Sequence, residues 1–203
     1  MAVDATQSAG LIPFDVQRDA VDVLVAGSYK GLLGPFGAGI LYINKELGEE
    51  LKPSLAGWRT TQTPYDLDAT KLSFAQGAKK FEYSTMSYSS AVGLAESMRY
   101  LRELGYAAVS THTLSLTREF LSMLKSNQKL PDNVSLTPED ESRHASIASI
   151  RFKERANSAI ARKLVERNVI VSHRFDGIRF SFNIYNTDQD LVRAADALTE
   201  VLA

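Results

Sequence analysis

Residues 21–34 read VDVLVAGSYKGLLG and residues 35–43 read PFGAGILYI, and these two stretches decide the fold. The apolar runs Val21–Ala26 and Ile40–Ile43 predict two strands, and continuous runs of this kind are typical of strands buried on both faces. Between the runs lies a glycine-rich turn that contains one lysine, Lys30. The pattern therefore predicts a sheet with a lysine just beyond the end of one of its strands.

Apolar periodicity along the rest of the chain predicts an α/β fold. Strands are expected at residues 2–4, 146–152, 169–172 and 178–182, and helices at residues 89–104, 109–125, 156–167 and 188–202. Gly105 is expected to stop the first of these helices and Thr187 to cap the last. Residues 45–78 are polar and predict a long irregular segment, and residues 127–138, with Pro131, predict turns.

Composition restricts the class of protein. The chain has 203 residues, of which 44% are hydrophobic, and a net charge of −1. The charge balance does not favour nucleic acid or an anionic membrane as a partner. Without cysteine there is no disulfide and no thiolate metal site, and the three scattered histidines predict no metal site either. A cytoplasmic protein is expected.

An acid at the end of one strand and a lysine at the end of another suggest a specific chemistry. Asp4 ends the first predicted strand and Lys30 follows the second. A lysine amine held near neutral forms imines, and an aspartate can keep a pyridine nitrogen protonated. Pyridoxal 5′-phosphate (PLP) requires both groups, so the pair predicts a PLP site.

Four blocks in this order resemble the class V aminotransferase family of fold-type I PLP enzymes, which includes epimerase-like proteins, kynureninases and cysteine desulfurases. The blocks are Asp4 with Gln7, residues 28–39, residues 80–85 and residues 177–187. The resemblance covers the second half of a family member. It implies that residues 1–85 are the C-terminal part of the large PLP-binding domain, with the Schiff-base lysine, and that residues 86–203 are the small C-terminal α/β domain, with a boundary near residues 81–89.

The resemblance implies a role for each matched residue around the cofactor ring. Lys30 would hold PLP covalently and move protons at the substrate Cα, although an ordinary exposed lysine is the alternative. Asp4 would pair with the pyridine nitrogen, unless it only stabilises the turn that follows it. Gln7 would bind the phenolic oxygen of the cofactor, or else lie solvated on the surface.

Phosphate and substrate contacts are implied at four further positions. Ser28 or nearby backbone amides would bind the phosphate, and Tyr29 stands where many relatives have histidine. Thr85 matches a position that reaches the phosphate of the partner subunit's cofactor, although Ser84 replaces the usual glycine before it. Arg179 would bind the substrate carboxylate, with an ion pair to Asp176 or Asp190 as the structural alternative.

The function expected from the resemblance is a PLP-dependent enzyme that acts at Cα of an amino acid, as a transaminase, epimerase or lyase, and as a homodimer. Desulfurase activity is disfavoured, because it needs a cysteine that these residues lack. Since residues 1–3 read as the middle of a buried strand, the chain is expected to be truncated, to self-associate and to bind PLP weakly by itself. The rival interpretation is a non-catalytic fragment that retains only a dimerising fold.

Overall fold

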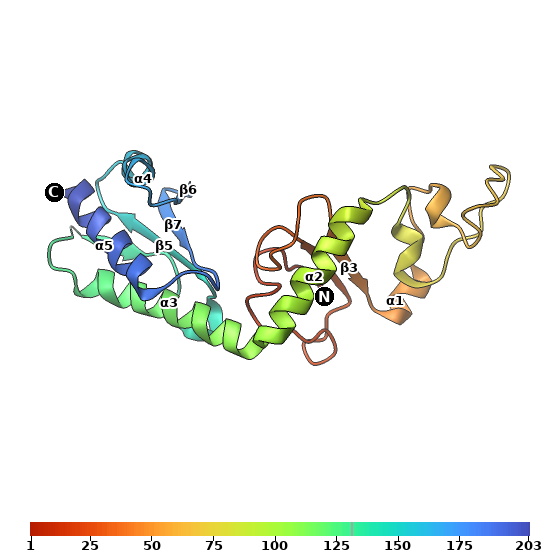
Figure 1. Cartoon of the computed structure of the whole chain (residues 1–203), viewed down its shortest axis with the longest axis horizontal. Coiled ribbons are helices and arrows are strands. Elements are labelled where there is room, and N and C mark those ends of the chain that lie inside the picture. The colour runs from red at the N-terminus through yellow and green to blue at the C-terminus, as the bar shows by residue number, and fades with distance from the viewer. Residues whose placement is uncertain (131) are drawn as a thin grey trace. The chain divides into compact units, whose positions relative to one another are not determined.

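The computed structural model describes residues 1–130 and 132–203, and it divides the chain into two compact units, Met1–Gly105 and Tyr106–Ala203 (Figure 1). Pro131, part of the predicted turns, lies outside the described residues. No helix in the described part is long and apolar enough to cross a membrane. The predicted assignment of residues 1–85 and 86–203 to a large and a small domain concerns the whole enzyme and stays a prediction.

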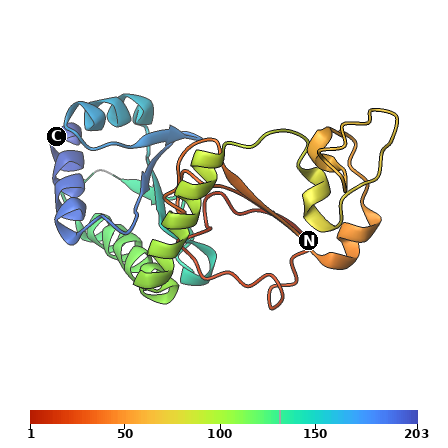
Figure 2. The ribbon, with the colours of Figure 1, turned by 45° about the vertical axis from the view of Figure 1, so that its right-hand side comes forward.

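The first unit contains a three-stranded sheet in the order β1-β2-β3. β1 (Ala2–Asp4) runs parallel to β2 (Val23–Gly27), and β3 (Gly39–Ile43) runs antiparallel to β2. Figure 2 shows the ribbon from a second direction. All three strands are where the apolar runs predicted them. The expectation that they are buried on both faces is wrong, because Val25 is 43% exposed and Leu41 is 40% exposed.

The segment predicted to be irregular holds more structure than its composition indicated. It begins with helix α1 (Lys45–Glu50) and contains the 3₁₀ turns η1 (Trp58–Thr60) and η2 (Gly77–Phe81). Helix α1 starts because the Asn44 side chain accepts a hydrogen bond from the backbone N–H of Leu47 at 2.8 Å. Its exposed, polar residues gave no apolar stripe from which a helix could be predicted.

Helix α2 (Tyr88–Leu104) packs on the loop that follows the lysine turn. The Ser97 hydroxyl donates to the Leu33 carbonyl at 2.9 Å, and the Ser90 hydroxyl donates to the Phe36 carbonyl at 2.8 Å. The helix ends at Gly105, whose φ is +84°. The predicted helix and its stop signal are thus both confirmed.

The second unit is a four-stranded sheet with three helices. The strand order is β4-β5-β7-β6 and every neighbouring pair is antiparallel. The strands are β4 (Asn133–Ser135), β5 (Ile147–Phe152), β6 (Ser172–Arg174) and β7 (Gly177–Ser181), and the helices are α3 (Tyr106–Ser126), α4 (Asn157–Glu166) and α5 (Asp188–Leu202).

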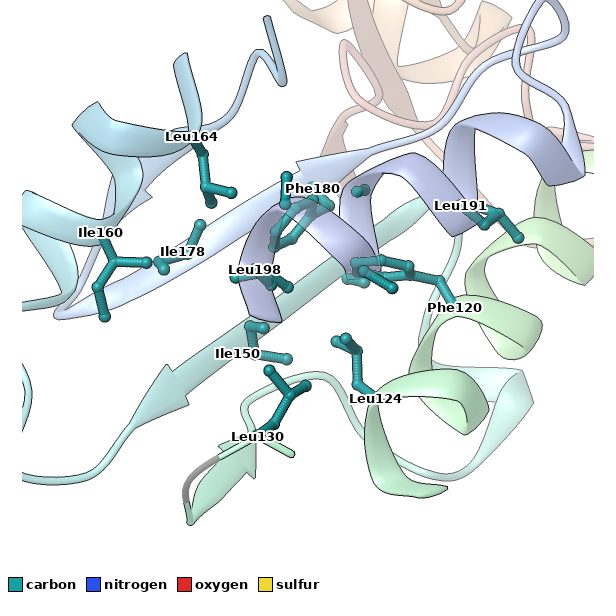
Figure 3. Packing of buried hydrophobic residues seen from close by; sticks show 14 of the residues in the cluster. Phe120, Leu124, Leu130, Ile150, Ile160, Leu164, Ile178, Phe180, Leu191 and Leu198 are labelled. Carbon is teal, nitrogen blue, oxygen red and sulfur yellow. The ribbon is translucent and has the colours of Figure 1, made fainter. Parts of the chain in front are cut away.

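One face of this sheet forms the hydrophobic core with the three helices (Figure 3). Along β5 every second residue is buried, which is the two-residue period of a strand covered on one face. Phe120 of α3 is fully buried and its ring lies 4.7 Å from that of Phe180 and 5.4 Å from that of Phe182. Leu164 of α4 and Leu198 of α5 are also fully buried in this cluster.

Two details of the second unit differ from the sequence prediction. The predicted turn segment contains the short strand β4, which pairs with β5. Strand β6 was expected at residues 169–172 but begins at Ser172, because the hairpin turn is formed by Phe175 and Asp176, with φ of +48° and +58°. The dipeptide Asp176-Gly177 is a strong sequence signal for a hairpin turn, but the turn lies one residue earlier, at Phe175 and Asp176.

Candidate active site

The turns after β1 and β2 lie side by side because these strands are parallel neighbours. Carboxyl ends of parallel strands meet at one edge of a sheet, which is where α/β proteins bind ligands. Asp4 ends β1, and Lys30 follows β2 by one turn. A bond from the Gly27 N–H to the Thr6 hydroxyl, at 3.0 Å, ties the two turns together.

The structure holds Asp4 as a carboxylate. Its side chain accepts a hydrogen bond from the backbone N–H of Thr6 at 2.9 Å. The hydroxyl and the N–H of Thr6, and more weakly the positive charge of Lys30, lower the pKa of Asp4 against a smaller opposing effect of desolvation. Asp4 is therefore anionic at neutral pH, with Thr6 as the main cause.

Backbone contacts fix the position of the lysine turn. A Cβ atom on Gly10 would lie 2.3 Å from the Gly31 carbonyl oxygen, and one on Gly31 would lie 2.5 Å from the Ala9 carbonyl oxygen. The chain after β1 thus touches the backbone next to Lys30, where no side chain fits. The sequence alone did not reveal this contact, because Gly10 and Gly31 belong to segments that are distant in sequence.

Ser28 and Tyr29 differ in what they offer to a ligand. Ser28 is fully buried and its hydroxyl donates to the Pro35 carbonyl, so a phosphate contact from this hydroxyl would require that bond to break. The Tyr29 ring is 46% exposed and stacks on Phe36 with ring centres 4.9 Å apart. The Lys30 amine lies 5.7 Å from the Tyr29 ring centre. The cofactor roles predicted for both residues stay predictions.

Gln7 and Thr85 are exposed, and Arg179 lies in the second unit. Arg179 is in β7 opposite Ser149 and Ser172, with its buried neighbours Ile178 and Phe180 on the core face. The alternation of the strand places Arg179 on the other face.

The Arg179 side chain has unused hydrogen-bonding capacity. Its Nε is buried and has no hydrogen-bond partner among the described residues. The alternative partner Asp190 instead accepts a hydrogen bond from the Thr187 N–H at 2.9 Å, in the capping box of α5. A buried guanidinium nitrogen without an acceptor is costly.

The Asp4 carboxylate and the Lys30 amine, which follow two parallel strands of the first unit, are the pair of groups from which the sequence predicted a PLP site. A family model described as aminotransferase class V matches residues 1–193. The chain belongs to the class V aminotransferase family. This family consists of PLP-dependent enzymes, so the predicted resemblance is confirmed.

Curated relatives of this class V chain are only distantly similar in sequence. An uncharacterized aminotransferase, YcbU of Bacillus subtilis, is 30% identical over 196 residues, which are 97% of this chain and 50% of the relative. A probable cysteine desulfurase of Pyrococcus abyssi is 27% identical, over 98% of this chain and 51% of the relative. The chain spans about half the length of the curated relatives that it matches.

Solved structures confirm the predicted α/β fold. The apo cysteine desulfurase of Thermococcus onnurineus superposes with a TM-score of 0.88 at 23% identity, over 99% of this chain and 52% of that one. The cystine C-S lyase C-DES, in complex with its product cysteine persulfide, gives 0.83 at 25% identity, over 96% and 50%. The chain is thus similar to about half of each of these proteins.

Proposed function

We propose that this chain is part of a PLP-dependent enzyme that acts at Cα of an amino acid. The observation that carries the proposal is the placement of Asp4 and Lys30 after two parallel neighbouring strands, whose following turns are joined by the bond from the Gly27 N–H to the Thr6 hydroxyl. Membership of the class V family supports it. When bound, PLP would supply an electron sink for the bond that breaks at Cα.

The residues proposed to hold the cofactor come from the turns after β1 and β2 and from the segment before α2. Lys30 would bind it covalently, the Asp4 carboxylate would keep the pyridine nitrogen protonated, and Gln7 would bind the phenolic oxygen. Ser28 with the backbone around it, and Thr85 from the partner subunit, would contact the phosphate. Tyr29 would lie beside the ring, since it is next to Lys30 and half exposed.

Two side chains are proposed to act on the substrate. The Arg179 guanidinium would bind the substrate carboxylate with its planar fork, which is the geometry that a carboxylate accepts. The Lys30 amine, once released, would take the proton from Cα and return it. Return of that proton to Cα would give epimerisation, its return to the cofactor would give transamination, and departure of a group from Cβ would give a lyase reaction. No residue of this chain is a cysteine, so none can carry a persulfide in a desulfurase reaction.

The test is reduction of the PLP-loaded protein with borohydride, followed by peptide mapping. The label is expected on Lys30, and Lys30→Ala should carry none. Lys80 is a suitable internal control, because its amine is buried and donates to the Gly48 carbonyl. Label on another lysine would overturn the assignment of Lys30, and no binding of PLP even at a large excess of the cofactor would overturn the function.

We further propose a cytoplasmic homodimer. Large apolar side chains on the first unit are exposed, including Phe36 at 78% and Val92 at 66%, and exposed apolar patches mark interaction surfaces. Light scattering after size exclusion should give the mass of two copies. A dimer that takes up no PLP would instead favour the rival interpretation, a non-catalytic fold that only dimerises.

A further inference from the structure

Two segments of the first unit that are far apart in sequence are joined by one arginine. Arg59, in η1, donates from Nε and Nη2 to the Glu82 carboxylate at 3.1 and 2.7 Å, and from Nη1 to the Tyr88 hydroxyl at 3.2 Å. The Arg59 side chain is only 17% exposed. Its guanidinium also lies over the Trp58 ring, 5.5 Å from the ring centre. Arg59 thus bonds to both ends of the segment between Glu82 and Tyr88.

Backbone contacts support the same junction. A Cβ atom on Gly57 would lie 1.9 Å from the Tyr83 carbonyl oxygen, so the two chains touch where no side chain fits. Thr60 is fully buried, and its hydroxyl accepts from the Gly57 N–H at 3.0 Å and donates to the Glu82 carbonyl at 3.4 Å. Residues 57–60 therefore form a fixed platform for Glu82 and Tyr83.

The residues between the two anchors are exposed and carry hydroxyl groups. Ser84 and Thr85 are exposed, and Ser87 bonds to the Ser90 hydroxyl at 2.8 Å at the start of α2. An exposed stretch of this kind loses conformational entropy when it binds a ligand, and fixing its ends in advance removes part of that cost. The contacts of Arg59 do this at both ends.

We propose that Arg59 is a positioning residue that holds Thr85 in place for the phosphate of the cofactor. The inference rests on the proposed function, in which Thr85 contacts that phosphate. The guanidinium reaches Glu82 and Tyr88 from three separate nitrogens, whereas a lysine has one donor nitrogen on a flexible stem and is expected to lose at least one of these contacts. Arg59 itself need not touch the ligand.

The first experiment separates the phosphate from the rest of the cofactor. In Arg59→Lys the dissociation constant for PLP should rise by about two- to tenfold, the range expected when an ordered segment becomes free. The affinity for pyridoxal, which has no phosphate, should not change. In a Thr85→Val background, Arg59→Lys should have no further effect on PLP. Equal weakening of both ligands, or no weakening of either, would overturn the proposal.

The second experiment needs no cofactor. Hydrogen exchange of the backbone amides of residues 83–87 should become faster in Arg59→Lys. It should increase less in Tyr88→Phe, which removes only one of the two anchors. This milder variant still tests the proposal if Arg59→Lys does not fold. The matched control is Arg99→Lys, since Arg99 bonds to Glu96 and Glu103 on the exposed surface of α2. Unchanged exchange in both test variants would overturn the positioning role. If exchange is faster in the Arg59 variant but the protein binds no PLP, then Arg59 does fix residues 83–87. The proposed function would be overturned in that case, and with it the phosphate contact of Thr85.

Discussion

The second unit of this chain packs apolar side chains, whereas the first unit packs the backbone of its turns. The second unit covers one face of its sheet with three helices and buries Phe120, Leu164 and Leu198 completely. The first unit leaves Val25 and Leu41 about two-fifths exposed, but packs the backbone of its turns so closely that side chains are excluded at Gly10 and Gly31. The second unit is thus held together mainly by apolar packing, and the proposed chemistry lies in the turns of the first unit.

Removing the lysine amine tests whether the first unit carries the chemistry, and it should have the largest effect, on turnover. In Lys30→Ala, turnover of the amino-acid substrate should fall by about 10²- to 10⁴-fold, the usual contribution of a positioned acid–base group. The thermal midpoint without PLP should barely change, because Lys30 is not part of a hydrophobic cluster. Steady-state kinetics measures the turnover and calorimetry measures the thermal midpoint. A large loss of stability would show that the lysine turn is structural.

Truncating a core residue tests whether apolar packing stabilises the second unit more than the first. Phe120→Ala should lower the free energy of unfolding of the second unit by about 3–5 kcal/mol, the range for a buried phenylalanine. Leu41→Ala, at an exposed strand position of the first unit, should cost less than about 1.5 kcal/mol, below the value for a fully buried leucine. Denaturant unfolding measures both, and equal losses would contradict the division of roles.

Arg179 belongs to the second unit but is proposed to serve the chemistry, so its substitution sharpens the comparison. Arg179→Lys keeps the charge and loses the fork, and substrate affinity should fall by about 10- to 100-fold, since hydrogen bonds to charged groups contribute about 1.5–3 kcal/mol. PLP affinity should be unchanged. If substrate binding is also unchanged, Arg179 is a structural residue of β7.

The smallest effect is expected at Thr6, beside Asp4. Thr6→Val removes the hydroxyl and keeps the backbone N–H, so the pKa of Asp4 should rise toward its ordinary value. A lowered pKa means that the Asp4 carboxylate favours the folded state above its ordinary pKa, and that this contribution is lost as the pH falls through the folded-state pKa. Thr6→Val should lose it at a higher pH, as a carbon-13 titration of the Asp4 carboxyl can show. An unchanged titration would mean that the backbone N–H alone sets the pKa.

The elements that sequence reasoning predicted well are those with a local signal. The apolar run of β2, the stripe of α2 with Gly105 after it, and Thr187 before α5 each need only neighbouring residues. Helix α1 was missed because its signal is one cap, Asn44, without an apolar stripe. The turn at Phe175 was misplaced because pairing across the sheet outweighs the conformational preference of phenylalanine.

The candidate site shows the same division. Asp4 and Lys30 could be predicted together because each ends a recognisable strand, and Arg179 because it interrupts an apolar one. The role of Arg59 could not be predicted, because its partners Glu82 and Tyr88 are brought to it only by the folded chain. Contacts between backbones, such as that of Gly57 with Tyr83, cannot be predicted from the pattern of polar and apolar residues in the sequence.

The close backbone contact between the segments of Gly10 and Gly31 limits which substitutions this sequence can tolerate. Each position has a carbonyl oxygen within 2.5 Å of where a side chain would begin, and Gly10 also has a φ of +86°. In a library randomised at every position and selected only for folded protein, both sites should return glycine, while the neighbouring exposed Gln7 should accept many residues. The intolerant positions would then outline the lysine turn for an observer who knows nothing of the reaction.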